Sequence, residues 1–149
     1  MCSSDLARLL IIAIDDVDKS VQLTQTVQRE FPNLTMLVRA KDRDHAYQLI
    51  NLGVRYIFRE TLDSSLDLSV QALRLLGFGA YRAHRAAKTF KAYDEESVRH
   101  LAGFVNSDEK DFLGELQRRV RTLDELFEAE RAGQVFRSDK GWDPPRPAD

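Results

Sequence analysis

The sequence has few of the features that crosslink a small protein or attach it to a membrane. Cys2 is the single cysteine among 149 residues, so no internal disulfide can form. The longest uninterrupted apolar run, Leu9 to Ile14, is six residues long, whereas a membrane-spanning helix needs about 20. The N-terminus has no basic stretch followed by a long apolar one, which argues against a secretory signal. We therefore expect a soluble, cytoplasmic domain.

An excess of charge of one sign is also missing. The chain has 22 Lys and Arg against 24 Asp and Glu, a formal net charge of −2. Because nucleic-acid binding depends mainly on a basic field, we expect no nucleic-acid partner. Neither a metal-ligand spacing nor a Ser/His/Asp or Cys/His pattern is present, so we expect no metal site, no catalytic residues and no enzyme activity.

Short apolar runs alternate with amphipathic stretches over the first 60 residues. The runs at 9–14, 34–38 and 54–58 predict strands, and the stretches at 17–31 and 45–52 predict helices. Short connections in the order β-α-β-α-β indicate parallel strands, and the first run is typical of a strand buried on both faces. Three strands make half of a doubly wound sheet, so the prediction is an α/β fold, the second half of a Rossmann-like sheet.

Helical patterns fill the rest of the chain. Apolar residues cover more than half of the helix predicted at 61–76, which indicates two partners, the sheet and a second subunit. A further helix is expected at 80–103 with an interruption near Tyr93 and Asp94, and a last one from about 106–109 with Ser107 or Asp108 as its cap. Its apolar residues form a narrow seam typical of a coiled coil: Phe112, Leu116, Val120, Leu123 and Phe127.

These patterns divide the chain into three parts. Residues 1–77 are predicted to form a partial nucleotide-fold domain, and residues 78–133 a helical arm for dimerisation and regulation. Residues 134–149, rich in proline and charge, are expected to be a disordered tail.

Charged residues follow all three predicted strands. The carboxyl ends of parallel strands meet at the edge where α/β sheets bind ligands. Arginines and lysines there favour an anionic or zwitterionic small molecule. Two alternatives stay open: the charged residues pair with one another, or one of the aspartates after the first strand merely caps a helix. His45 is expected to be a first-turn helix residue rather than a ligand. The candidate contacts are Asp15, Asp16, Arg39, Lys41 and Arg59.

Several motifs together resemble a known family. They are Leu10 to Asp16, Phe31 to Leu34, Val38 to His45, Gly53-Val54, Arg59 to Thr61, and Leu76-Gly77. Their order and spacing are similar to the cytosolic regulatory domain of Kef-type potassium efflux proteins, a potassium-conductance-regulating domain of the TrkA-N type. The resemblance covers about residues 6–101 and extends more weakly to 141–143.

The resemblance implies a fold, partners and a ligand. It implies a Rossmann-like domain beneath a membrane transport domain, on the cytoplasmic side of the bacterial inner membrane, that forms homodimers through its helices. In this family glutathione keeps the potassium pathway closed and electrophile adducts of glutathione open it. Arg59 matches an arginine that binds glutathione, and Asp94 matches a ligand-contacting position that is asparagine in one branch.

The resemblance also implies what this chain does not carry. The family binds its nucleotide through the first half of the fold, with a Gly-x-Gly-x-x-Gly turn. Here Gly77-Phe-Gly79 does not fit that motif, because Arg82 occupies the position of the third glycine and no strand is predicted before Gly77. We therefore expect no nucleotide cofactor in this part, and we interpret the chain as the C-terminal piece of a larger antiporter.

Two other functions remain open from the sequence. A response-regulator receiver also has a strand ending in two aspartates, but it needs a later phosphoacceptor acid, and the second strand here ends in Arg39. A stand-alone helical adaptor would use the seam from Phe112 to Phe127 to bind a partner helix.

Overall fold

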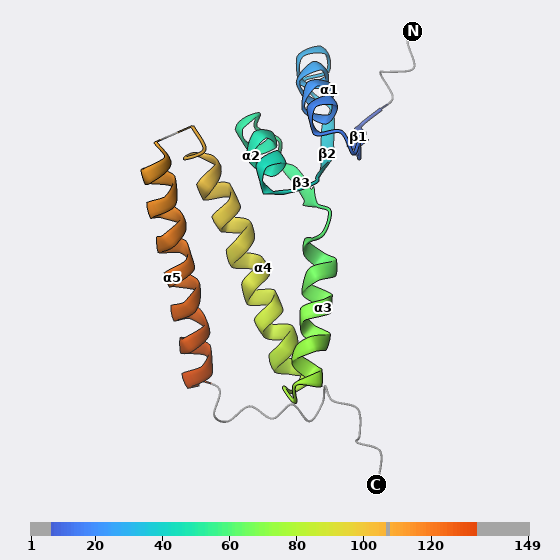
Figure 1. The fold of residues 1–149 in the computed structure, drawn as a ribbon. Helices are drawn as coiled ribbons and strands as arrows, with labels where there is room; N and C mark the ends of the chain where they lie inside the picture. The colour runs from blue at the N-terminus through green and yellow to red at the C-terminus, as the bar shows by residue number, and fades with distance from the viewer. Residues whose placement is uncertain (1–6, 107, 134–149) are drawn as a thin grey trace. The chain divides into compact units, whose positions relative to one another are not determined.

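The computed structural model describes residues 7–106 and 108–133 (Figure 1). Ser107 and the predicted tail at 134–149 lie outside the described residues. Two compact units share the described chain: 7–62 with 98–106, and 63–97 with 108–133. The elements are β1 (Leu9–Ile12), α1 (Val17–Glu30), β2 (Thr35–Ala40), α2 (Arg43–Asn51), β3 (Tyr56–Arg59), α3 (Leu62–Leu75), α4 (Ala80–Ala102) and α5 (Glu109–Gly133).

The first unit contains a three-stranded parallel sheet in the order β1-β2-β3. Ile12 pairs with Val38, and Ala40 pairs with Arg59. The predicted β-α-β-α-β order is confirmed, although β1 ends at Ile12 rather than at residue 14. Because the chain crosses the sheet twice in the same direction through right-handed connections, α1 and α2 cover the same face.

That shared face is the core of the first unit. Ile12, Val38 and Ala40 are at most 1% exposed beneath buried side chains of α1 and α2, such as Val27 and Leu49. The alternating residues of β1 point the other way, and Ile11 is 65% exposed. The expectation that the first strand is buried on both faces is therefore wrong in this structure, because both crossover helices lie on one face.

Aspartates begin both crossover helices. An Asp16 carboxylate oxygen accepts a 3.0 Å hydrogen bond from the Lys19 N–H at the start of α1. Asp42 does the same for the His45 N–H, at 2.8 Å, at the start of α2. Each carboxylate satisfies an N–H that has no partner within its helix. Gly53 ends α2 with φ of +80°, as its predicted capping role requires.

The second unit is helical. It contains α3, most of α4, and α5, and α4 lies beside α5 (Figure 1). Gly77, with φ of +91°, turns the chain between α3 and α4. Lys91 of α4 forms an ion pair with Asp63 of α3, and the Tyr93 hydroxyl of α4 donates to the Arg119 carbonyl of α5 at 2.7 Å.

Helix α4 runs without a break from Ala80 to Ala102, so the predicted interruption near Tyr93 and Asp94 is wrong. The segment has no glycine or proline and is rich in alanine, the strongest helix former. The hydrogen bond of Tyr93 to α5 adds a tertiary contact at the suspected break. Polar residues in the middle of the pattern therefore do not stop this helix.

Helix α5 starts at Glu109, one residue after Asp108, whose carbonyl accepts the first helical hydrogen bond from the Phe112 N–H at 3.1 Å. This start agrees with the prediction. Within the predicted seam, Val120 is 54% exposed and the four other residues are half-buried. The seam is therefore only partly covered in the single chain.

Candidate functional site

The charged strand ends of the first unit form a rim around Arg39. Its guanidinium forms an ion pair with Asp15 and donates a 3.2 Å hydrogen bond to the Ala13 carbonyl. Its Nε lies 3.9 Å from a Glu60 carboxylate oxygen. Arg39 thus bridges residues that follow β1 and β3. The charge of Arg39 is balanced within the rim, which is the self-paired alternative that the sequence leaves open.

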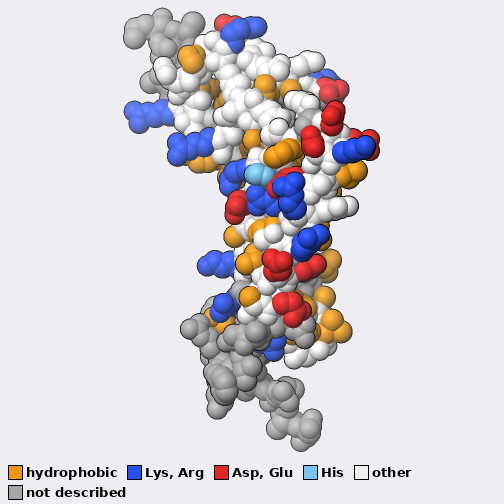
Figure 2. All heavy atoms as spheres, turned by 90° about the vertical axis from the view of Figure 1, so that its left-hand side faces the viewer, with side chains coloured by type: hydrophobic (Ala, Val, Ile, Leu, Met, Phe, Trp, Pro, Cys, Tyr) orange, Lys and Arg blue, Asp and Glu red, His pale blue; other side chains and the backbone are white. Residues whose placement is uncertain are grey.

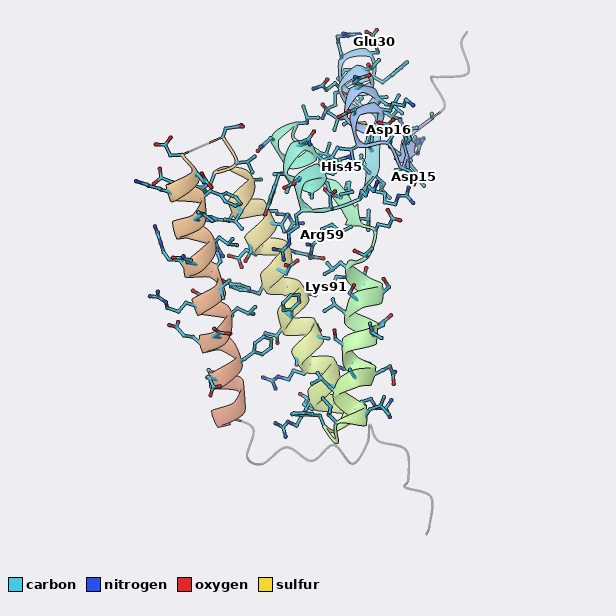
Figure 3. The ribbon with its side chains drawn as sticks, in the orientation of Figure 1. Asp15, Asp16, Glu30, His45, Arg59 and Lys91 are labelled. Atoms are coloured by element: carbon cyan, nitrogen blue, oxygen red, sulfur yellow. The ribbon has the colours of Figure 1, made fainter. Side chains whose placement is uncertain are left out.

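Asp16 follows β1 beside Asp15 (Figure 3) but is used locally. Besides capping α1, it lies 3.3 Å from the Lys19 ammonium. The hydrogen bonds and charge of Lys19 hold the pKa of the Asp16 carboxyl below its usual value, with the backbone hydrogen bond as the largest cause. Asp16 therefore stays ionised as a helix cap, the structural role that the sequence offered as an alternative.

His45 is a first-turn residue of α2, as expected, and it is fully buried. Its Nδ1 accepts a 3.2 Å hydrogen bond from the Lys41 N–H, so Nε2 carries the proton of the neutral ring. Burial lowers the pKa of His45 more than the nearby Asp42 carboxylate raises it. Nε2 has no hydrogen-bond partner among the described residues. Through its N–H, the Lys41 backbone connects the loop between β2 and α2 to His45. The side chain of Lys41 is exposed.

Arg59 ends β3 on the opposite face of the sheet from Arg39. In the parallel register Arg59 pairs with the buried Ala40, whereas Arg39 pairs with the exposed Phe58. Since paired residues of neighbouring strands point to the same side, Arg59 shares the face that α1 and α2 cover. Arg59 is half-buried there. The structure therefore does not bring the two candidate arginines together.

Asp94 lies in the part of α4 that belongs to the second unit and is 5% exposed. Ser97, one turn later on the same side of the helix, is 8% exposed, and its hydroxyl has no hydrogen-bond partner among the described residues. The sequence pattern did not single out Ser97. Arg59 belongs to the first unit and Asp94 to the second, so the two expected glutathione contacts are described separately.

A polar cluster between α4 and α5 was also not anticipated. The Arg119 guanidinium lies 5.9 Å from the Tyr93 ring centre, 3.6 Å from a Glu115 oxygen and 3.5 Å from a Glu96 oxygen. Glu115 is 8% exposed, so this is a largely desolvated carboxylate with a cationic partner. The cluster fixes α5 against the turn of α4 that carries Asp94.

The surface charges are mixed. Figure 2 shows basic and acidic side chains interspersed on the face that it presents. None of the helices in the described ranges, 7–106 and 108–133, has the length and apolar content needed to cross a membrane. In the same ranges, no group of three or more His, Cys, Asp or Glu side chains is arranged to hold a metal ion.

The fold and the rim define a class: a Rossmann-like α/β domain extended by a helical arm. A family model described as the TrkA-N domain matches residues 3–60. A second model, described as the potassium efflux system KefB C-terminal domain, matches residues 64–141. The chain belongs to this potassium efflux family, and it corresponds to the regulatory C-terminal domain of Kef-type systems.

Relatives and a solved structure agree with this assignment. The chain is 35% identical over 136 residues to the glutathione-regulated potassium-efflux system protein KefC of Cronobacter sakazakii, and 34% identical to that of Escherichia coli. Each match covers 91% of this chain and 22% of the relative, so the chain spans about a fifth of these proteins. A structure titled Shewanella denitrificans Kef CTD in AMP bound form is 40% identical, with a TM-score of 0.66 over 68% of this chain and 64% of that one.

Proposed function

We propose that this chain is the glutathione-sensing part of a Kef-type potassium efflux and proton antiport system. The observation that carries the proposal is its match to the KefB C-terminal domain over the helical arm, together with relatives named as glutathione-regulated. Within the whole protein it acts beneath a membrane transport domain on the cytoplasmic side of the bacterial inner membrane. It regulates transport and catalyses no reaction of its own.

Arg59 and Asp94 are the proposed glutathione contacts. Glutathione is a flexible tripeptide with two carboxylates and one ammonium group. The half-buried guanidinium of Arg59, at the strand end where α/β sheets bind ligands, suits one of its carboxylates. The carboxylate of Asp94 can accept hydrogen bonds from a peptide N–H or an ammonium but cannot donate as an asparagine would.

The rim of Asp15, Arg39 and Glu60 is a weaker candidate for ligand contact. Its charges already satisfy one another, so a ligand would have to displace an existing ion pair. Asp16 is occupied as a helix cap, and the side chain of Lys41 is exposed. We therefore assign the rim mainly to holding the ends of β1, β2 and β3 together.

We infer that a nucleotide is not the ligand of these residues. The solved Kef relative is described as AMP-bound, and phosphate groups are usually held by a glycine-rich turn at a helix N-terminus. These 149 residues contain no Gly-x-Gly-x-x-Gly motif. We further propose that the domain forms homodimers through its helical arm, as the family resemblance implies.

Calorimetric titration of the full chain tests the proposed ligand. We expect saturable binding of reduced glutathione, competition by an S-alkylated glutathione adduct, and no heat of binding with AMP. A chain that binds AMP but neither form of glutathione would contradict the proposal. Binding of both forms at independent sites would contradict the shared regulatory site.

A further inference from the structure

Two hydrogen bonds connect the His45 ring to the strand end that carries Arg59. The Lys41 N–H donates to His45 Nδ1 at 3.2 Å, and the Glu60 N–H donates to the Ala40 carbonyl at 2.9 Å. The Ala40 carbonyl and the Lys41 N–H belong to the same peptide group, called the 40–41 peptide below. A single peptide group therefore lies between the His45 ring and the residue that follows Arg59.

The two hydrogen bonds of the 40–41 peptide support each other. Its carbonyl is a stronger acceptor for the Glu60 N–H while its own N–H donates to the ring, because hydrogen bonds in a chain polarise one another. The two bonds also fix the orientation of the 40–41 peptide, since a peptide group is planar and turns as a unit. The ends of β2 and β3 are therefore held together beyond their last pair, Ala40 with Arg59.

The position of Arg59 depends on this connection. Arg59 is the last residue of β3, and its pairing with Ala40 places its side chain on the face of the sheet that α1 and α2 cover. The bond from the Glu60 N–H holds the backbone directly after Arg59. Without this bond the end of β3 is free to rotate, and the guanidinium moves with it.

The His45 ring has one nitrogen in use and one without a partner. The ring is fully buried, and the His45 backbone is held by its 2.8 Å hydrogen bond to Asp42. Nε2 has no hydrogen-bond partner among the residues that the structure describes. Burial of such a polar atom costs stability that an apolar side chain of similar size would avoid. The acceptor at Nδ1 is therefore the feature of histidine that this position uses.

The charged groups around the ring leave it neutral. Burial lowers the pKa of His45 more than the Asp42 carboxylate raises it. The three strands place one charged side chain on the helix-covered face, that of Arg59. Arg43 and Asp44, the neighbours of His45 on α2, are exposed. The other helices of the first unit bury uncharged side chains, namely Ser20, Thr24 and Val27 of α1 and Val98, Leu101 and Ala102 of α4.

We propose that His45 is a positioning residue for Arg59: its neutral ring accepts the hydrogen bond of the 40–41 peptide and thereby holds Arg59 in place for glutathione. The inference rests on the proposed contact of Arg59 with glutathione. A protonated ring carries a hydrogen on both nitrogens, so Nδ1 then opposes the Lys41 N–H and the 40–41 peptide turns. Affinity for the ligand is therefore complete while the ring is neutral and falls in acid, as the ring takes up a proton.

Amide NMR of the full chain tests the connection without any ligand. From pH 7.5 to pH 5 we expect the chemical shift of the Glu60 N–H to follow the titration of the His45 ring. Its exchange with solvent should be about two- to tenfold faster in His45→Leu than in His45→Asn, whose side-chain oxygen replaces the acceptor Nδ1. The Leu34 N–H, which donates to the Phe31 carbonyl before β2, is the internal control and should exchange equally in both variants. A Glu60 shift that does not follow the ring, or equal exchange of Glu60 in the two variants, would overturn the proposal.

Calorimetry with S-methylglutathione, which has no thiol to titrate, tests the consequence for the ligand. At pH 7.5 we expect His45→Leu to bind about two- to tenfold more weakly than the wild type, the ratio given by loss of one hydrogen bond. His45→Asn and the control His84→Leu, at an exposed position on α4, should bind as the wild type does. At pH 5 the wild type should weaken by a similar factor, and His45→Asn should not.

The outcomes separate this inference from the proposed function. Equal affinities of His45→Leu and His45→Asn would overturn the positioning role. So would a wild-type affinity that rises in acid, as simple attraction between a charged ring and the ligand carboxylates would give. If the wild type does not bind the ligand at either pH, the proposed function is wrong, and the exchange of the Glu60 N–H still decides whether His45 positions the end of β3.

Discussion

The Tyr93 hydroxyl donates a 2.7 Å hydrogen bond to the Arg119 carbonyl and thereby joins the middle of α4 to α5. The Arg119 guanidinium in turn lies over the Tyr93 ring, 5.9 Å from its centre. The hydrogen bond and the cation–π contact thus join the same two residues, at the turn of α4 that carries Asp94.

Tyr93→Phe tests the strength of this connection. The variant keeps the ring and the cation–π contact but removes the donor, so we expect the free energy of unfolding to fall by about 0.5–1.5 kcal/mol. Urea denaturation followed by circular dichroism measures the change. Tyr56→Phe is the control, since the contact of Arg55 with Tyr56 involves the ring. Equal effects of the two substitutions would show that the hydroxyl of Tyr93 has no special role.

Asp42→Ala tests the cap of α2. Asp42 accepts the hydrogen bond from the His45 N–H, and loss of a cap of this type costs about 0.5–2 kcal/mol. The stability of the folded chain, measured by urea denaturation, should fall by that amount. Asp42→Asn retains the acceptor oxygen and should remain close to the wild type. If Asp42→Asn loses as much stability as Asp42→Ala, the charge of Asp42, rather than its hydrogen bond, supports the loop.

Buried His45 predicts a dependence of stability on pH. Because the pKa of His45 is lowered by burial, the unfolded chain takes up this proton at a higher pH than the folded chain. Stability is therefore complete above the usual histidine pKa of about 6.5 and declines as the pH falls toward the lower, folded-state pKa. Melting temperatures measured from pH 8 to pH 5 should show this decline.

His45→Asn is the variant that isolates this effect. It keeps an acceptor for the Lys41 N–H and cannot titrate, so its melting temperature should decline less between pH 6.5 and pH 5. The control is His84→Asn, at an exposed position on α4, which should decline as the wild type does. If His45→Asn and wild type lose stability in parallel, another group is responsible for the acid sensitivity.

Asp94→Asn tests the proposed ligand contact in the second unit. The substitution weakens the attraction to the single ammonium of glutathione, but it also removes the repulsion of its two carboxylates and adds an amide donor for them, so the net change favours binding. We expect glutathione to bind about five- to tenfold more tightly, which corresponds to about 1.0–1.4 kcal/mol. Calorimetry measures the change. Unchanged affinity would mean that Asp94 does not contact glutathione.

The order of elements could be predicted from sequence because it depends on local patterns. The apolar runs before Asp15 and before Arg39 mark strands, and Asp16 and Asp42 begin helices at positions that local capping chemistry explains. The uninterrupted α4 could not be predicted in the same way. A polar stretch at Tyr93 suggests a break, and the contact with α5 is known only from the tertiary structure.

The arrangement at the rim depends on register, which the sequence does not contain. Arg39 and Arg59 both follow apolar runs, so they were expected to meet at one ligand site. The pairing of Arg59 with Ala40 places them on opposite faces of the sheet. Likewise, the apolar run at β1 indicates burial on both faces. The exposure of Ile11 shows that the second cover is not supplied by α1 or α2.

The central claim is that the chain binds glutathione through Arg59, and one comparison tests it most directly. Glutathione is titrated by calorimetry into wild type, Arg59→Gln and Arg55→Gln, the last being an exposed arginine directly before the same strand. Loss of a charged hydrogen bond worth about 1.5–3 kcal/mol should weaken binding by Arg59→Gln about 10- to 150-fold, while Arg55→Gln binds as the wild type does. Equal affinity of all three proteins, or an equal loss in both variants, would contradict the account.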